Sequence, residues 1–532
     1  MASSLSISNG GGSPQLLTTL ARLFAQTFTR SNVPKAIGAY VLYLLFKYRN
    51  TAFGARPRPD IDGPRGFPMI GNTIEMMRRP RAKNYQLQTE SHELHYGPFY
   101  TVSFPGVGRI INITEPEMVD HVLRVNFWAY EKGAYLRNTL GPMVGQGIFG
   151  ADGEHWRWQR KLASHIFNVK SFRAYTSDVF CQETNTAIDY LSTVADTGKV
   201  IDLQNIFYLF TLDSFGEIAF GQSFGCLKDP EREVEFAAAF DRLNFALSYR
   251  IISPIWKLTD WWTGNGKAVE KDTKTVHDFA YNVIKKRREE LAKGGHEYKD
   301  LMQLFMDGMD ENGEPLSDEM LKDELINMIL AGRDTTAQAL SWMFYLMHRE
   351  DASSEILFQL NEEIDSILKG ELPTYESTKQ QKYAEACFYE TLRLYPSVPQ
   401  NMKVCVQDDV LPGGLKVYKG EHVGWCSWAM GRLEANWGPD AKEFKPERWL
   451  TGEKPSSSKF VSFHLGPRTC LGQQFATIEA ITIMSMLLQK FTFELVDPNT
   501  EPQYLPALTL PMADGLPVRV KRRMPPTGEQ KK

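Results

Sequence analysis

Apolar residues recur at three- and four-residue spacing over most of the chain, and this spacing predicts a mainly helical protein. The pattern extends from about residue 116 to residue 368. Its most apolar stretch, residues 321–348, predicts a long helix that crosses the core, and residues 471–491 predict another helix. No repeat and no wide break interrupts the pattern, so we expect one large domain.

Strand patterns are few and short. Alternating apolar and polar residues predict strands at about residues 99–104 and 491–496. After Pro396 the chain becomes irregular, with strand-like pieces between turns rich in proline and glycine. The predicted fold class is therefore mainly α with a minor β region: a single large helical domain plus small antiparallel sheets.

The first 50 residues form a distinct N-terminal part. Residues 1–13 are a Ser- and Gly-rich tail of the kind that is disordered. Residues 14–28 place apolar side chains on one helical stripe, and a second apolar run covers residues 36–46. That run is shorter than the roughly 20 residues that span a bilayer, so we expect a helix embedded in the membrane surface or a tilted anchor. The alternative is an N-terminal helix packed on the domain.

Residues 51–72 are rich in proline and glycine and predict a stiff hinge between this anchor and the main domain, residues 73–532. Basic residues after the apolar run, such as Lys47 and Arg49, favour a cytosolic position for the main domain.

Charge and cysteine content exclude several classes of protein. The chain of 532 residues has 60 Lys and Arg against 64 Asp and Glu, a net charge of −4. This balance offers no excess of basic charge to hold a nucleic acid. The six cysteines are scattered and form no CxxC pair, which excludes a zinc ribbon or a disulfide framework and fits a reducing compartment.

One cysteine lies in a loop suited to a bound metal. The sequence FHLGPRTCLG places Cys470 close to the start of a predicted helix, where the helix dipole favours an anion and lowers a thiol pKa. Gly472 lets backbone amides approach the sulfur, Phe463 is placed to cover it, and Arg468 offers donors to a carboxylate. A thiolate so placed is an axial ligand for haem iron. The alternative is a buried structural cysteine.

From residue 64 onward the chain resembles the cytochrome P450 superfamily of haem-thiolate monooxygenases. The family's motifs occur in its order: WxxxR at Trp156 and Arg160, the central-helix motif at Ala331, Gly332, Arg333, Asp334 and Thr335, ExxR at Glu390 and Arg393, the PERF-like segment at residues 444–449, and FxxGxRxCxG at Phe463, Gly466, Arg468, Cys470 and Gly472.

The resemblance implies haem, iron protoporphyrin IX, with Cys470 as its metal ligand. Trp156 and Arg160, four residues apart on a helix, would donate hydrogen bonds to the haem propionates; the alternative is an exposed aromatic and basic helix. Lys403 stands where related sequences often have another propionate-binding arginine. The remaining cofactor-binding residues that the family's motifs imply are Gly332, Phe463, Arg468 and Gly472.

Asp334 and Thr335 interrupt an apolar helix, where polar groups are costly unless they are used. As the implied catalytic pair, they would relay protons to bound O₂ in a groove opened by a kink at Gly332. The alternative is that both bond the backbone of their own helix. Glu390 and Arg393 share a helix face and would form a buried network with Arg448; an exposed ion pair is the alternative.

The implied reaction is the insertion of one oxygen atom of O₂ into a C–H bond of a lipophilic substrate. Because only 62 residues (532 − 470) follow Cys470, we expect the electrons to come from a separate NADPH-cytochrome P450 reductase. The expected location is the endoplasmic reticulum membrane, with the catalytic domain in the cytosol.

Subtype motifs such as AGRDTT resemble the fungal and plant branch that hydroxylates fatty acids and alkanes near the chain end. Two alternatives remain open: the same chemistry on a terpenoid-like scaffold, and a haem-thiolate isomerase or sensor. The loops expected to face the substrate are residues 135–149, 240–252, 399–402 and 508–512.

Overall fold

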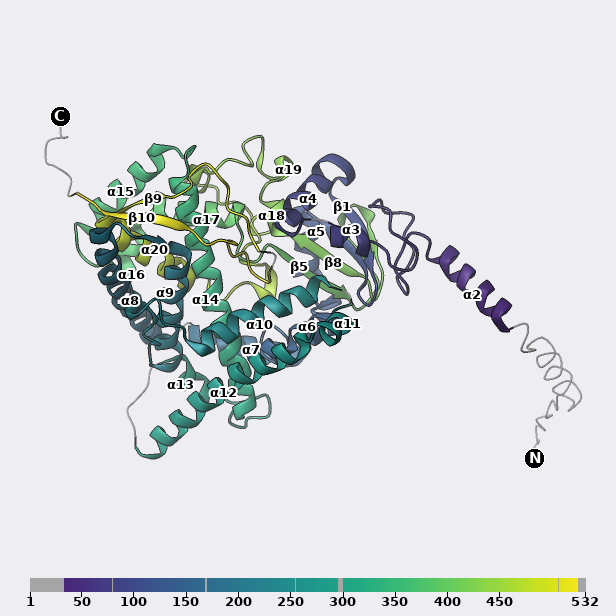
Figure 1. The fold of residues 1–532 in the computed structure, drawn as a ribbon, viewed down its shortest axis with the longest axis horizontal. Helices are drawn as coiled ribbons and strands as arrows, with labels where there is room; N and C mark the ends of the chain where they lie inside the picture. Colours follow the sequence, from purple (N-terminus) through teal and green to yellow (C-terminus); the bar gives the residue numbers. More distant parts are fainter. Residues whose placement is uncertain are drawn as a thin grey trace, which may run out of the picture.

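The computed structural model describes residues 33–78, 80–167, 170–253, 255–294, 300–505 and 507–524. Helices dominate this part of the chain, as the spacing of apolar residues predicted (Figure 1). The helices are α2 (Val33–Lys47), α3 (Thr73–Arg78), α4 (Asn84–Glu90), α5 (Pro116–Asp120), α6 (Gly133–Val144), α7 (Gly153–Phe167), α8 (Lys170–Thr197), α9 (Leu203–Phe220), α10 (Glu235–Ile252), α11 (Trp256–Thr263), α12 (Asn265–Ala292), α13 (Leu301–Met306), α14 (Asp318–His348), α15 (Ser354–Leu368), α16 (Tyr375–Gln380), α17 (Lys382–Leu394), α18 (Ser427–Met430), α19 (Glu434–Trp437) and α20 (Gln473–Lys490).

The strands are β1 (Phe99–Phe104), β2 (Gly108–Ile113), β3 (Tyr130–Glu131), β4 (Val200–Asp202), β5 (Gln400–Cys405), β6 (Asp409–Val410), β7 (Lys416–Val417), β8 (His422–Cys426), β9 (Phe491–Leu495) and β10 (Pro517–Arg522). They form one sheet in the order β1-β2-β8-β5-β3, a second in the order β4-β10-β9, and the pair β6-β7. The predicted fold class is confirmed, with one difference: β2 and β8 are parallel, so the larger sheet is mixed.

Burial explains the position of β8 at the centre of the larger sheet. All five of its residues are buried, and its two neighbours, β2 and β5, supply hydrogen bonds on both edges. A strand that is covered on both faces and paired on both edges tolerates an apolar sequence without alternation. The sheet lies on the side of the molecule nearest α2, and the long helices lie on the other side (Figure 1).

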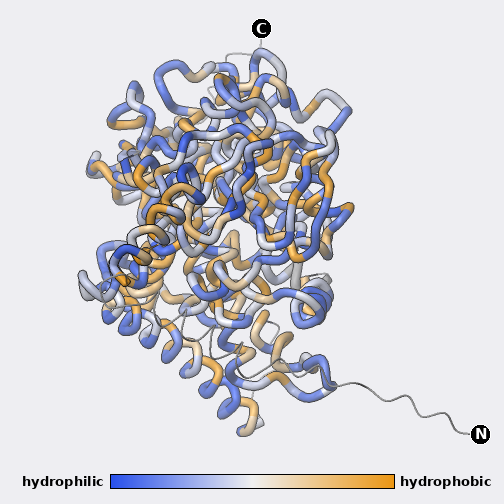
Figure 2. Tube along the Cα trace, turned by 90° about the vertical axis from the view of Figure 1, so that its right-hand side faces the viewer, coloured by the Kyte–Doolittle hydropathy of each residue, from blue (hydrophilic) through white to orange (hydrophobic). Residues whose placement is uncertain are grey.

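Helix α14 is the central element of the core, and the predicted long helix is therefore confirmed. Ser317 caps its first turn by accepting a hydrogen bond from the amide of Met320, and Asp318 and Glu319 add favourable charge at that end. Almost all of its middle is buried against α9, α17 and α20. Along the more peripheral helices, hydrophilic and hydrophobic positions alternate (Figure 2), as expected where one face packs on the core.

Helix α2 covers the second apolar run of the N-terminal part and extends away from the body of the molecule (Figure 1). It has no buried residue, and Leu42 and Phe46 are 68% and 72% exposed. The alternative of a helix packed on the domain is therefore wrong for this segment; the stripe at residues 14–28 lies outside the described residues. Within the described residues, no helix has the length and apolar character needed to cross a membrane.

Residues 51–72 lie against the larger sheet. Arg58 is buried and binds Asp60, Glu421 and the carbonyl of Lys416, while the guanidinium of Arg109 in β2 donates to the carbonyl of Arg56 at 2.7 Å. These bonds fix the chain between α2 and the domain, so this segment has a defined path over the sheet.

Candidate functional site

A large cavity of about 630 Å³ lies between the helical part and the larger sheet. Cys470 lines it, and its side chain is exposed to this internal space although it lies deep beneath the molecular surface. The loop that carries Cys470 is held by the hydrogen bond from its amide to the carbonyl of Phe463, at 2.8 Å. Gly466 has a φ of 68°, and a β carbon there would lie 2.1 Å from the carbonyl oxygen of Leu123. Only glycine fits this turn, so the motif's glycine is explained by local geometry.

The thiol of Cys470 differs from the prediction in one respect. Burial raises the pKa of this thiol, whereas the sequence predicted a lowered value. The amide of Gly472 and the positive charge of Arg160 act in the opposite direction but do not outweigh burial. The helix that follows begins at Gln473, three residues later, so its dipole acts from a greater distance than expected. A cation bound at the sulfur is therefore needed to favour the thiolate.

Cationic side chains gather at one edge of the cavity around Asp152. The carboxylate of Asp152 accepts from the guanidinium of Arg468 at 3.0 Å and from Arg137, and it also accepts the backbone amides of Lys132 and Gly133. Burial lowers the pKa of Arg468 to about 10 and that of Lys132 to about 8, because each guanidinium or ammonium has lost water and lies near other cations. Positive charge therefore exceeds negative charge at this edge.

Trp156 and Arg160 both line the cavity from α7, so the predicted common face is present. Trp156 is 4% exposed, and the guanidinium of Arg468 lies 4.3 Å from the centre of its ring. Lys403 is buried beside this group, with its ammonium 4.4 Å from the ring centre of Phe127. Burial lowers the pKa of Lys403 well below its ordinary value. Lys403 is not among the described residues that line the cavity.

These residues fit a haem. The cavity offers one thiol, and its cationic edge suits two propionates. Two buried donor atoms there, Nε2 of His464 and Nε of Arg468, have no hydrogen-bond partner among the described residues. Buried polar groups are normally paired, so these atoms indicate a bound group that completes the site. Phe463 closes this side, with its ring against Tyr389 at 6.1 Å.

The ExxR pair forms the buried network that was predicted. Arg393 donates to both carboxylate oxygens of Glu390 at 2.8 and 2.7 Å, and neither side chain is exposed. Arg448 adds a contact at 3.4 Å, and the indole of Trp449 donates to Glu390 at 2.9 Å. The alternative of an exposed ion pair is therefore wrong. The network joins α17 to the chain before the cysteine loop.

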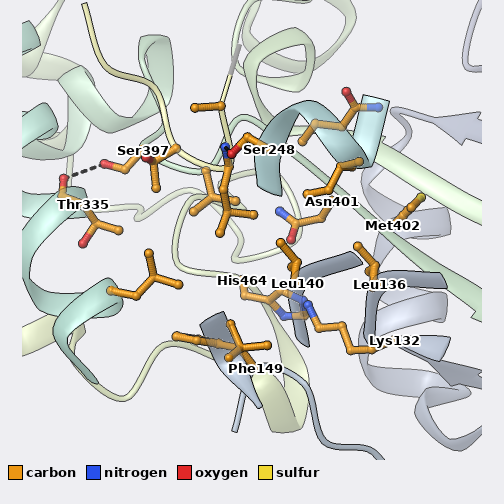
Figure 3. Close-up of a pocket in the computed structure, with 18 of the residues that line it drawn as sticks. Lys132, Leu136, Leu140, Phe149, Ser248, Thr335, Ser397, Asn401, Met402 and His464 are labelled. Carbon is orange, nitrogen blue, oxygen red and sulfur yellow. Dashed lines mark hydrogen bonds between the residues drawn. The ribbon is translucent and has the colours of Figure 1, made fainter. Parts of the chain in front are cut away.

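Asp334 and Thr335 are separated by the turn of α14. Thr335 lines the cavity (Figure 3), and its hydroxyl donates to the carbonyl of Ala331 at 2.6 Å. Asp334 does not line the cavity; it is 2% exposed, accepts from Asn244 of α10 at 2.7 Å and contacts Arg333 at 3.1 Å. Burial raises the pKa of its carboxyl to about 6. Thr335 therefore faces the cavity, whereas Asp334 is held against α10.

Gly332 also lines the cavity, but the structure explains the need for glycine at this position by packing and not by the predicted kink. Helix α14 continues through Gly332 without interruption. A β carbon at this position would lie 2.4 Å from the ring of Phe215 in α9. Glycine here lets α9 approach α14 closely, so the expectation of a kinked helix is not met in this structure.

All four loops that were expected to face the substrate reach the cavity. Those loops contribute Tyr135, Leu136, Arg137, Leu140, Val144, Ile148, Phe149, Ser248, Tyr249, Ile251, Gln400, Asn401, Met402, Leu508 and Thr509. The sequence reasoning missed Lys132, Asp152 and His464. Two of these residues had a signal in the sequence: Lys132 in the segment EKG, and Asp152 in the segment ADGEHW. Both are charged residues beside a predicted apolar loop, where a charge needs a partner.

The geometry defines a class of protein: one that binds a metal-containing cofactor through a single thiolate inside an apolar cavity. Comparison with known proteins agrees. The family model "Cytochrome P450" matches residues 61–514. The chain is 37% identical to cytochrome P450 monooxygenase cyp1 of Mycosarcoma maydis, over 91% of this chain and 78% of that protein. It is 33% identical to cytochrome P450 704B1 of Arabidopsis thaliana, over 87% and 95% of the two chains. The chain therefore belongs to the cytochrome P450 family, and its cofactor is haem with an axial cysteine thiolate.

Proposed function

We propose that this cytochrome P450 monooxygenase hydroxylates a lipophilic, chain-like substrate held in the cavity above Cys470. The observation that carries the proposal is the cavity itself: among the described residues it contains one thiol, and much of its wall is apolar, formed by residues such as Leu136, Leu140 and Phe149. Ligand cavities of this size bury most of the surface of a small ligand, and apolar walls favour an apolar chain.

Cys470 is the proposed iron ligand, and the haem, when bound, supplies the activation of O₂. Trp156, Arg160 and Arg468 would hold its propionates, because all three line the cationic edge of the cavity. Phe463 and Gly472 flank the sulfur and limit its access to water. The Glu390–Arg393 pair does not touch the site; it stabilises the segment that leads to the loop.

Thr335 is the proposed proton-handling group on the substrate side. Its hydroxyl lies on the cavity wall and can rotate from the carbonyl of Ala331 toward a water molecule in the cavity. Asp334 would supply the proton from the other face of α14. For this, its bond to Asn244 must open, since the carboxyl is otherwise directed at α10. Proton transfer by positioned groups of this kind contributes about 10²–10⁴-fold to rates.

The electrons would come from a separate NADPH-cytochrome P450 reductase, and the domain would lie on the cytosolic face of the endoplasmic reticulum membrane. Support comes from α2, whose exposed apolar side chains would be buried in a lipid surface. Removing residues 1–50 should move the protein from the membrane fraction to the soluble fraction without loss of haem. Persistent membrane association of the shortened protein would contradict this role.

The experiment that tests the proposed function is a spectral binding screen. The purified holoenzyme would be titrated with alkanes, fatty acids, fatty alcohols and terpenoids, and the shift of the haem absorption band would report entry into the site. Chain-like lipids should bind, and reconstitution with the reductase should give a product with one added oxygen atom. Binding of terpenoids alone would contradict a chain-like substrate.

A further inference from the structure

The wall of the cavity formed by α4 and β5 carries a group of side-chain amides, which we name the amide cluster: Gln88, Gln400 and Asn401. The Nε2 atom of Gln88 donates to Oε1 of Gln400 at 3.0 Å, and this bond joins α4 to β5. All three residues line the cavity. The other residues of α4 and β5 that line the cavity are Asn84, Tyr85 and Met402, so this wall carries no charged side chain.

One member of the amide cluster, Gln88, has unused hydrogen-bonding capacity. Gln88 is 6% exposed, and its Oε1 has no partner among the described residues. Exchanging the orientation of both glutamine amides still leaves one polar atom of Gln88 free. Asn401 lines the same cavity, where Figure 3 shows it near Ser248 and Leu140, and it is partly exposed. A buried amide without a partner is unfavourable by about 1–3 kcal/mol, so the free Oε1 of Gln88 indicates a ligand group.

The charges around the cavity define what that group is. Four cations line the cavity within the described residues, and they lie at the edge around Asp152 and Cys470: Lys132, Arg137, Arg160 and Arg468. The carboxylate that lines the cavity, Glu75, is in α3, the helix before α4. A substrate carboxylate at the amide cluster would therefore be desolvated beside neutral amides, with no cation to compensate it.

We infer that the amide cluster binds an uncharged polar group of the substrate that carries a hydrogen-bond donor, such as a hydroxyl or an amide on a lipid chain. This inference rests on the proposed function and specifies its substrate: a neutral lipid rather than an ionised fatty acid. A hydroxyl would donate to Oε1 of Gln88, which satisfies this free atom, and it would accept from the amide of Asn401 on the same wall. Discrimination would follow, because an analogue without the polar group leaves these amides unpaired.

The test compares ligands that differ only in the polar end. Dissociation constants of dodecane, dodecanol and dodecanoate for the full-length holoenzyme would be measured from the shift of the haem absorption band, at a pH where dodecanoate is ionised. Dodecanol should bind about tenfold more tightly than either of the other two. Equal or tighter binding of dodecanoate would overturn the inference, and this arm needs no variant.

Variants then locate the effect. Asn401→Leu should bring dodecanol to within about threefold of dodecane, with dodecane itself unchanged. Gln88→Leu should act in the same direction. Met402→Leu is the matched control, since it alters the same strand and the same wall without removing a hydrogen-bonding group, and it should keep the preference for dodecanol. A preference that survives both amide substitutions would overturn the inference. If no chain ligand binds, the proposed function fails as well, so the two failures are distinguishable.

Discussion

The two sides of the cavity differ in the charge of their side chains and in how those side chains are bound. On the Cys470 side, the carboxylate of Asp152 is bound by Arg468 and Arg137. Glu390, which does not line the cavity, is bound in a similar way by Arg393, Arg448 and Trp449. On the opposite side, the wall formed by α4, α10 and β5 carries neutral side chains, and the buried Oε1 of Gln88 has no partner among the described residues. A buried charge network tolerates little change, because removing one partner leaves another uncompensated. A neutral residue of the opposite wall can be replaced without leaving a buried charge unpaired. We therefore expect the chemistry to depend on the Cys470 side and the substrate specificity on the opposite side.

The strongest test of this contrast is the substitution Cys470→Ser. The serine hydroxyl keeps the size of the side chain but gives no thiolate, so the absorption band of the thiolate type in the reduced CO complex should be lost entirely. Cys426→Ser is the matched control, because Cys426 is buried in β8 and does not line the cavity; it should keep the band. A thiolate-type band in Cys470→Ser would contradict the assignment of the ligand.

Thr335→Ala tests whether the opposite side also contributes to the chemistry. The variant should still consume NADPH, but the product formed per NADPH should fall by about tenfold or more, with peroxide released, because proton delivery is impaired. The measurement uses the enzyme reconstituted with its reductase.

Ser341→Ala is the control for Thr335→Ala. The hydroxyl of Ser341 also donates to the backbone of α14, to Ala337 at 2.7 Å, but it is fully buried and lies away from the cavity. Equal uncoupling in both variants would assign Thr335 a structural role only.

The charge network can be tested with two ion pairs on one helix. Arg393→Leu should lower the free energy of unfolding by about 3–5 kcal/mol, because Glu390 is left buried without its main partner. Lys382→Leu removes a pair of the same spacing in α17, with Glu385 at 2.9 Å, but the lysine side chain is 63% exposed. It should change the stability by less than about 0.5 kcal/mol. Denaturant unfolding of both variants checks this, and similar losses would contradict the contrast between the two pairs.

The same contrast explains how much could be predicted from the sequence. The cysteine loop, the ExxR pair and the helix α14 were predicted, because each depends on residues close together in the chain. The separation of Asp334 from the cavity could not be predicted, since it depends on Asn244 and α10, 90 residues away in sequence. The amide cluster joins residues 312 positions apart. The parallel pairing of β2 with β8 was missed for the same reason.

The core next to the cavity wall also holds Glu479, a carboxyl on α20 that is buried beside Thr336 of α14. Burial raises its pKa to about 8, well above its ordinary value. Between about pH 5 and pH 8 the native protein therefore holds a proton at this site that the unfolded chain has released. Stability from this group is present at the lower pH and is lost as the pH rises toward 8.

Glu479→Gln removes this titration while keeping the size and shape of the side chain. The unfolding free energy of the original protein, taken relative to that of the variant, should therefore fall by about 1 kcal/mol or more from pH 5 to pH 8. One pKa unit corresponds to about 1.4 kcal/mol. Denaturant unfolding at both pH values measures it, and taking the difference cancels the other titrating groups. A difference that does not change with pH would mean that Glu479 is ionised in the native protein. The interface of α20 with α14 would then hold an unpaired charge, and burial of charge would no longer separate the two sides of the cavity.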